Sequence, residues 1–118
     1  ASWCGNCAVV MPHLAGIIRE HEHDDVRFVF VSVDADPLAL MDYLIRNRYD
    51  GLFTPYLLRQ RQDDTLTDAI GGLKGHYKDG IPYLAFFDRT GKLTAELDGT
   101  VSRENILAAL ARTKGITP

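Results

Sequence analysis

Two cysteines, Cys4 and Cys7, are the residues of this 118-residue chain best suited to chemistry, and the sequence contains no other cysteine. They lie in the stretch Trp3-Cys4-Gly5-Asn6-Cys7. A disulfide that closes so short a loop would constrain the unfolded chain very little, so a purely structural bridge would be poorly placed here. Redox exchange and metal binding are the chemistries that remain.

A helix is predicted to begin at this cysteine pair, because apolar residues recur at helical spacing from about Cys4 to His21. Residues three apart at the start of a helix share one face, and their separation permits a disulfide. The unpaired N–H groups and partial positive charge of a helix N-terminus favour a thiolate, and such cysteines have a pKa of about 3.5–7.5 instead of about 8.5. The thiolate is the form that attacks disulfides.

The position of each cysteine predicts its role. Cys4 is nearer the helix terminus and more exposed, so we expect it to be the attacking nucleophile. Cys7 lies one turn deeper and is expected to be the resolving thiol that releases the substrate. Trp3 is expected to lie flat beside the pair and shield it, with an ordinary core aromatic as the alternative.

The remaining elements alternate in a way that predicts one α/β layered domain over residues 1–118. A buried parallel strand and a right-handed crossover require a strand before the first helix, so we expect N-terminal strands of the domain to be missing from this chain, either cropped or supplied by a partner. In chain order, the predictions are a strand at Val26–Val33, a helix from Pro37 to about Arg48, a short strand or extended loop at Leu52–Leu58, a weak helix at Leu66–Tyr77, a hairpin of Tyr83–Asp88 with Lys92–Leu97, and a helix at Arg103–Arg112.

Two of these elements carry detailed predictions. The strand at Val26–Val33 is almost wholly apolar, which is typical of a strand covered on both faces. Asp36 and Pro37 form an N-cap and first-turn pair for the next helix. The residues of that helix expected to face inward are Leu38, Met41, Leu44 and Ile45.

The sequence SWCGNC resembles the active-site loop of the thioredoxin superfamily. The segment Gly80-Ile81-Pro82, followed by the strand YLAFFD, a DRTGK turn and a second strand, resembles the cis-proline loop and terminal hairpin of that family. The resemblance implies a thioredoxin fold with a central mixed sheet flanked by helices. It also implies that Pro82 is cis and packs against the cysteine pair, and that the backbone of Ile81 pairs with an extended substrate segment. A trans proline that opens a strand is the alternative.

The same resemblance implies a thiol–disulfide oxidoreductase that needs no cofactor beyond its own redox-active disulfide. Its protein substrates would contact Trp3, Gly5, Asn6, Ile81 and Pro82. Its partners would be protein thiols or disulfides and an upstream electron donor. The alternative is a non-catalytic binding module of the same fold, or a Cu(I) carrier, since thiolates suit Cu(I).

Two features depart from the thioredoxin pattern. Gly5-Asn6 stands between the cysteines where thioredoxins commonly have Gly-Pro, which leaves the direction of the redox reaction open. The stretch between Cys7 and Pro82 is longer than in a minimal thioredoxin and is more similar to TlpA/ResA-type proteins. These are commonly bacterial, extracytoplasmic reductases, often tethered to the membrane. The similarity favours a reductase in the periplasm or on another extracytoplasmic side, with an anchor possible upstream and the cytoplasm still open.

Other chemistries have weaker support in the sequence. The net charge of −3 argues against nucleic-acid binding, which needs clustered Lys and Arg. The four histidines form no second close ligand pair of the kind that a Cys2His2 zinc site requires, so no metal site is predicted. Asp34 ends a predicted strand and is a candidate proton acceptor for the cysteine pair, with a loop or cap residue as the alternative.

Overall fold

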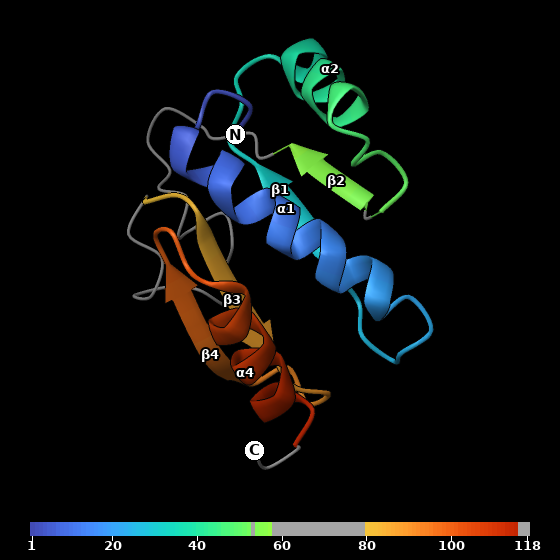
Figure 1. The fold of residues 1–118 in the computed structure, drawn as a ribbon, viewed down its shortest axis with the longest axis vertical. Coiled ribbons are helices and arrows are strands. Elements are labelled where there is room, and N and C mark those ends of the chain that lie inside the picture. The colour runs from blue at the N-terminus through green and yellow to red at the C-terminus, as the bar shows by residue number, and fades with distance from the viewer. Residues whose placement is uncertain (53, 58–79, 116–118) are drawn as a thin grey trace. The chain divides into compact units, whose positions relative to one another are not determined.

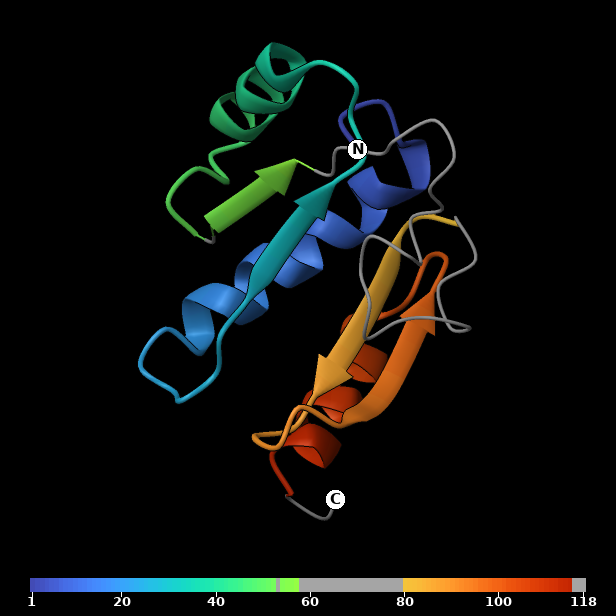
Figure 2. The ribbon, with the colours of Figure 1, turned by 180° about the vertical axis from the view of Figure 1, so that it is seen from behind.

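The structure is a computed structural model that describes residues 1–52, 54–57 and 80–115. The chain divides into two compact units. The first unit contains Ala1–Cys4 and Ile18–Asp79, and the second contains Gly5–Ile17 and Gly80–Pro118. Figures 1 and 2 show the elements of both units from opposite sides. The helix predicted at Leu66–Tyr77 lies outside the described residues.

The first unit contains a strand–helix–strand arrangement of β1 (Val29–Ser32), α2 (Pro37–Arg46) and β2 (Thr54–Leu57) (Figure 1). Strands β1 and β2 pair in parallel, with Val29 opposite Thr54 and Ser32 opposite Leu57. A parallel pair needs a crossover connection, and α2 lies in that connection. The segment predicted as a short strand or extended loop therefore forms a strand, and the strand predicted at Val26–Val33 is confirmed in its centre.

The prediction that both faces of β1 are covered is wrong for one face. The side chains of Val29 and Val31 are 55% and 42% exposed, whereas Ser32 is fully buried. Successive side chains of a strand point to opposite sheet faces, so Val29 and Val31 share the face that is left exposed. An apolar composition alone did not reveal that only one face of this strand is covered.

Helix α2 begins as predicted. Asp36 is its N-cap, and the Asp36 carboxylate accepts a hydrogen bond of 2.9 Å from the backbone N–H of Leu38. Pro37 occupies the first turn, where a backbone N–H has no partner within the helix, so proline loses no hydrogen bond there. The helix ends at Arg46, and Asn47 caps it with backbone and side-chain N–H groups that donate to carbonyls of the last turn.

The inward face predicted for α2 is only partly right. Leu44 is buried, but its buried partner is Leu40. The predicted residues Leu38, Met41 and Ile45 are exposed, Leu38 by 77% of its surface. Residues four apart lie one above the other on a helix, so the buried stripe runs through Leu40 and Leu44.

The second unit contains most of helix α1 (Gly5–Glu20), an antiparallel hairpin of β3 (Tyr83–Phe87) and β4 (Leu93–Asp98), and helix α4 (Arg103–Thr113). Helix α4 contacts both strands of the hairpin (Figure 1). The predicted hairpin is confirmed. Its turn is closed by the Asp88 carboxylate, which accepts hydrogen bonds from the N–H and hydroxyl of Thr90 and the N–H of Lys92.

Both helices of this unit agree with their predicted bounds to within about two residues. The oxygen of Ser102 accepts a hydrogen bond from the N–H of Asn105 and caps α4. The two helices lie close together at Gly16 of α1 and Arg103 of α4. A Cβ added to Gly16 would lie 3.4 Å from the guanidinium of Arg103. The buried side chains of the unit's helices are Cys7, Val10, Met11, Ala15, Ile17, Ile106, Ala109 and Leu110.

Candidate functional site

The two cysteines are joined by a disulfide, so the structure shows their oxidised state. Helix α1 begins at Gly5, which puts Cys4 at the N-cap position and Cys7 in the first turn. The side chain of Cys7 is buried, with 7% of its surface exposed, whereas Cys4 is only half-buried. The cysteine nearer the helix terminus is therefore the more exposed residue, as the sequence predicted.

The residues around the disulfide are open to solvent. Trp3 is 69% exposed, so the alternative of a core aromatic is wrong. Gly5 and Asn6 are also exposed, and a Cβ built on Gly5 would meet no atom within 4 Å. Packing within the chain therefore does not require a glycine at this position.

A tight turn over Ala1–Cys4 leads into the helix. The N–H of Cys4 donates to the carbonyl of Ala1 at 3.2 Å, so Ser2 and Trp3 are the two central residues of the turn. Both belong to the compact unit that contains β1 and α2. The conformation of this turn sets the direction in which the chain enters Cys4.

Asp34 holds this turn from the end of β1. The backbone N–H of Ser2 donates to both carboxylate oxygens of Asp34, at 3.1 and 3.0 Å, and the Ser2 hydroxyl donates to Oδ1 at 2.6 Å. Within the strand, the hydroxyl of Ser32 donates to Oδ2 of Asp34 at 2.6 Å. Asp34 is only 4% exposed, so the carboxylate is a buried group with its oxygens satisfied by neighbouring donors.

These donors determine the charge state of Asp34. Burial by itself would raise the pKa of the carboxyl, but the hydrogen bonds from Ser2 and Ser32 outweigh it and bring the pKa below its ordinary value. Asp34 is thus an ionised anchor of the turn at neutral pH. It caps no helix, since Asp36 fills that role for α2.

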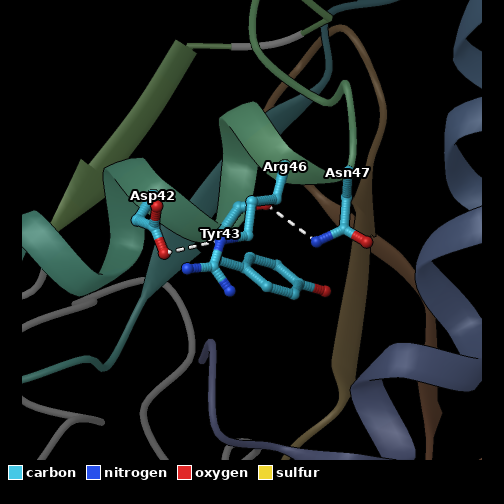
Figure 3. Close-up of polar contacts among 4 residues, drawn as sticks. All are labelled: Asp42, Tyr43, Arg46 and Asn47. Atoms are coloured by element: carbon cyan, nitrogen blue, oxygen red, sulfur yellow. Dashed lines mark hydrogen bonds and ion pairs between the residues drawn. The ribbon is translucent and has the colours of Figure 1, made fainter.

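A polar hollow of about 310 Å³ lies next to Ser2 on the surface of α2. Within it, Nε of Arg46 and the carboxylate of Asp42 form an ion pair at 3.1 Å, and the Asn47 amide donates to the backbone carbonyl of Tyr43 at 2.8 Å (Figure 3). Asp42 and Arg46 thus pair with each other on the exposed side of the helix, and Asn47 pairs with the helix backbone. The lining residues are Ser2, Ala39, Asp42, Tyr43, Arg46 and Asn47.

The Ile81–Pro82 peptide bond is cis, the isomer that the family resemblance implies. Pro82 is buried and belongs to the same compact unit as Cys7. The next residue begins β3, and the Tyr83 hydroxyl donates to Oε2 of Glu96 on β4 at 2.7 Å. Burial, followed by this hydrogen bond and the charge of Glu96, raises the pKa of Tyr83 well above its ordinary value.

No group of three or more His, Cys, Asp or Glu side chains suited to holding a metal ion occurs among residues 1–52, 54–57 and 80–115. Within the same ranges, no helix is both long and apolar enough to cross a bilayer.

Comparison with solved structures shows a close match in architecture. The crystal structure of StoA from Bacillus subtilis superposes with a TM-score of 0.68 over 92% of this chain and 75% of the StoA chain, at 19% sequence identity. StoA has the thioredoxin fold. The present chain has a thioredoxin fold. No family model matches the chain, and no curated protein matches it by sequence.

In this chain the cysteines lie at the start of α1, and the cis-proline comes immediately before β3. The sequence did not predict the contact of Asp34 with Ser2. The usable signal was the order Ser32-Val33-Asp34 at the end of an apolar strand, where alternation brings Ser32 and Asp34 to the same side. No pattern in the sequence pointed to Ser2 as the partner.

Proposed function

We propose that this protein is a thiol–disulfide oxidoreductase that exchanges disulfides with protein substrates through Cys4 and Cys7. The observation that carries the proposal is the disulfide at the N-terminus of α1, with an accessible Cys4 and a buried Cys7. An N-cap side chain can accept hydrogen bonds from N–H groups of the first helical turn. A Cys4 thiolate at this position would therefore be stabilised by those N–H groups and by the helix dipole.

The reduced protein would act in two exchange steps. The Cys4 thiolate attacks one sulfur of a substrate disulfide, so that this disulfide breaks, a mixed disulfide with Cys4 forms, and the other substrate sulfur leaves as a thiolate. The Cys7 thiolate then attacks the sulfur of Cys4 and releases the substrate as a dithiol. Two electrons pass to the substrate, and the Cys4–Cys7 disulfide remains to be reduced by an upstream dithiol donor.

Five residues are proposed to contact the substrate around this reaction. The exposed indole of Trp3 offers an apolar surface beside Cys4, and the open space above Gly5 allows a substrate backbone to approach. Asn6 supplies an exposed amide between the cysteines. Ile81 and Pro82 directly precede β3, and the Ile81 backbone is proposed to pair with an extended segment, in the manner of strand addition.

We propose that the reaction runs as a reduction of substrate, on an extracytoplasmic side of the membrane. Support comes from the long stretch between Cys7 and Pro82 and from the structural likeness to StoA. Both features favour the TlpA/ResA-type branch of proteins with this fold. The upstream electron donor would then be a dithiol that can reach that compartment.

The test is turnover and trapping with single-cysteine variants. The wild-type protein is incubated with insulin as the disulfide substrate and dithiothreitol as the donor, and insulin reduction is followed by turbidity. We expect Cys4→Ser to abolish the catalysed reduction. Cys7→Ser, reduced beforehand and freed of dithiothreitol, should accumulate a mixed disulfide with insulin, visible on a non-reducing gel and by mass spectrometry, because the resolving thiol is missing.

The matched control is Val9→Ser, which places a serine at an exposed position of the same helix and should retain wild-type turnover. Insulin reduction that persists in Cys4→Ser would show that the nucleophile is assigned wrongly. Wild-type protein that accelerates insulin reduction no more than the donor alone would contradict the proposed activity.

A further inference from the structure

The buried carboxylate of Asp34 accepts hydrogen bonds from Ser2, which lies in the turn that leads into Cys4. We infer that Asp34 is a positioning residue for the nucleophile, and that it acts by holding Ser2 and thereby the Ala1–Cys4 turn. This inference rests on the proposed function, because positioning matters only if Cys4 attacks a substrate.

Three hydrogen bonds fix Ser2 to Asp34. The N–H is shared between the two carboxylate oxygens, and the hydroxyl makes a short bond of 2.6 Å to Oδ1. Because both the main chain and the side chain are held, Ser2 can neither shift nor rotate without breaking a charge-assisted bond. The Cys4 N–H donates to Ala1 across the same turn, so fixing Ser2 also restricts Cys4.

The support behind Asp34 is itself rigid. Ser32 is fully buried on β1, its hydroxyl donates to Oδ2 of Asp34, and its Oγ accepts the backbone N–H of Asp34 at 3.0 Å. Ser32 lies opposite Leu57 in the parallel pair of strands. A reactive group supported from a strand in this way is held more precisely than one supported only by a loop.

Positioning of this kind affects reactions that depend on geometry. Exchange with a folded disulfide substrate requires the sulfur of Cys4 to meet a sulfur that the substrate presents in a restricted orientation, and misplacement by about 1 Å can lower such rates by up to about 100-fold. Alkylation by a small reagent such as iodoacetamide has little orientational demand. It depends mainly on the thiolate fraction and accessibility of Cys4.

The test compares these two reactions in Asp34→Asn, Ser2→Ala and Ser2→Thr, with Asp36→Asn as the control. The control removes the same charge two residues along the chain, where asparagine caps α2 as well as aspartate does. We expect Asp34→Asn to slow exchange with insulin by about tenfold. Ser2→Ala should slow exchange less, because the bonds from the Ser2 backbone N–H remain. Ser2→Thr keeps the hydroxyl and should retain the wild-type rate.

The rate of Cys4 alkylation at a pH where the thiol is fully ionised should stay at the wild-type value in all four variants. Far-UV circular dichroism at the assay temperature confirms that each variant is folded. If Asp34→Asn does not fold, the contrast between Ser2→Ala and Ser2→Thr decides the question.

Two outcomes would overturn the inference while leaving the proposed function intact. In the first, the wild type turns over insulin, and Asp34→Asn or, where that variant does not fold, Ser2→Ala is as fast. In the second, alkylation and exchange slow in parallel, which would place the effect on access to Cys4 or on the nucleophilicity of its thiolate. A wild-type protein with no exchange activity is a separate result, since it contradicts the proposed function and the inference together.

Discussion

Replacing Asp34 with asparagine should destabilise the folded protein strongly at neutral pH and hardly at all at low pH. The substitution keeps the shape of the side chain but replaces one carboxylate oxygen with an NH2 group, which cannot accept a hydrogen bond. Ser2 and Ser32 together direct donors at both oxygens of Asp34, so one of these donors would face another donor. The site is buried, and water cannot easily compensate for the loss.

The size of the effect follows from these bonds. A hydrogen bond to a charged group contributes about 1.5–3 kcal/mol, and the remaining amide oxygen preserves part of the network, so we expect a net loss of about 2–3 kcal/mol. In a domain of 118 residues, each kcal/mol corresponds to roughly 4 °C in the melting temperature. Asp34→Asn should therefore lower the melting temperature by about 8–12 °C.

The pH dependence has a definite sign. The pKa of Asp34 is lower in the folded protein than its ordinary value, because the hydrogen bonds from Ser2 and Ser32 outweigh the effect of burial. The contribution of the carboxylate to stability is therefore complete above the ordinary unfolded-state pKa of about 3.9 and is lost as the pH falls through the folded-state pKa. The difference between wild type and variant should be constant from neutral pH to about pH 5 and should shrink below about pH 4.

The assay is urea unfolding followed by far-UV circular dichroism at neutral pH, about pH 5 and about pH 3, with the cysteines kept oxidised. Asp36→Asn is the matched control and should unfold close to the wild type at each pH. The reasoning is refuted if Asp34→Asn lies within about 0.5 kcal/mol of the wild type at neutral pH. It is equally refuted if the full difference persists at the lowest pH.

Substitutions at three residues of the second unit test its stability by urea unfolding. Ser102→Ala removes the N-cap of α4 and should cost about 1 kcal/mol, whereas Ser102→Asp should keep the cap; equal losses in both would contradict this role. Ile106→Ala empties a site that is only 2% exposed and should cost about 2–5 kcal/mol, so a loss below 1 kcal/mol would mean that the site is not well packed. Tyr83→Phe removes the bond to Glu96 and should cost less than about 1.5 kcal/mol. Because the pKa of Tyr83 is raised, the ultraviolet titration of this variant near pH 10 should coincide with that of the wild type, and a missing tyrosine signal in that range would contradict the assignment.

Local signals in the sequence were sufficient for the element ends and the hairpin. The caps of α2 and α4, formed by Asp36 with Pro37 and by Ser102, contact only residues close to them in the sequence. The turn at Asp88 is likewise closed by a bond to a near neighbour, Thr90. These features depend on side-chain chemistry next to the backbone that they cap. They are therefore independent of how distant parts of the chain meet.

The buried face of α2 shows where periodicity alone is insufficient. The helix carries apolar residues at positions 38, 40, 41, 44 and 45, which cover more of its circumference than one neighbouring layer can bury. Several faces satisfy the helical period equally well. The choice of Leu40 with Leu44 depends on tertiary packing, which the spacing does not contain.

The candidate site divides in the same way. The cysteine pair and its place at a helix start follow from five consecutive residues, and the cis-proline was found through family resemblance. The bond between Asp34 and Ser2 joins residues 32 positions apart and depends on where the end of β1 lies relative to the turn. Ser2 carries no distinguishing chemistry of its own, so only a structure could reveal its role.

The central claim is that the Cys4–Cys7 disulfide exchanges with other proteins rather than bracing the fold. Its reduction potential, measured by equilibration with glutathione and dithiothreitol redox buffers and quantified by mass spectrometry, tests this claim most directly. We predict a value in the range of catalytic pairs, near about −270 mV if the protein is a reductase, whereas a value near about −120 mV would keep the exchange but reverse its direction. A potential below about −300 mV would identify a structural disulfide and contradict the account.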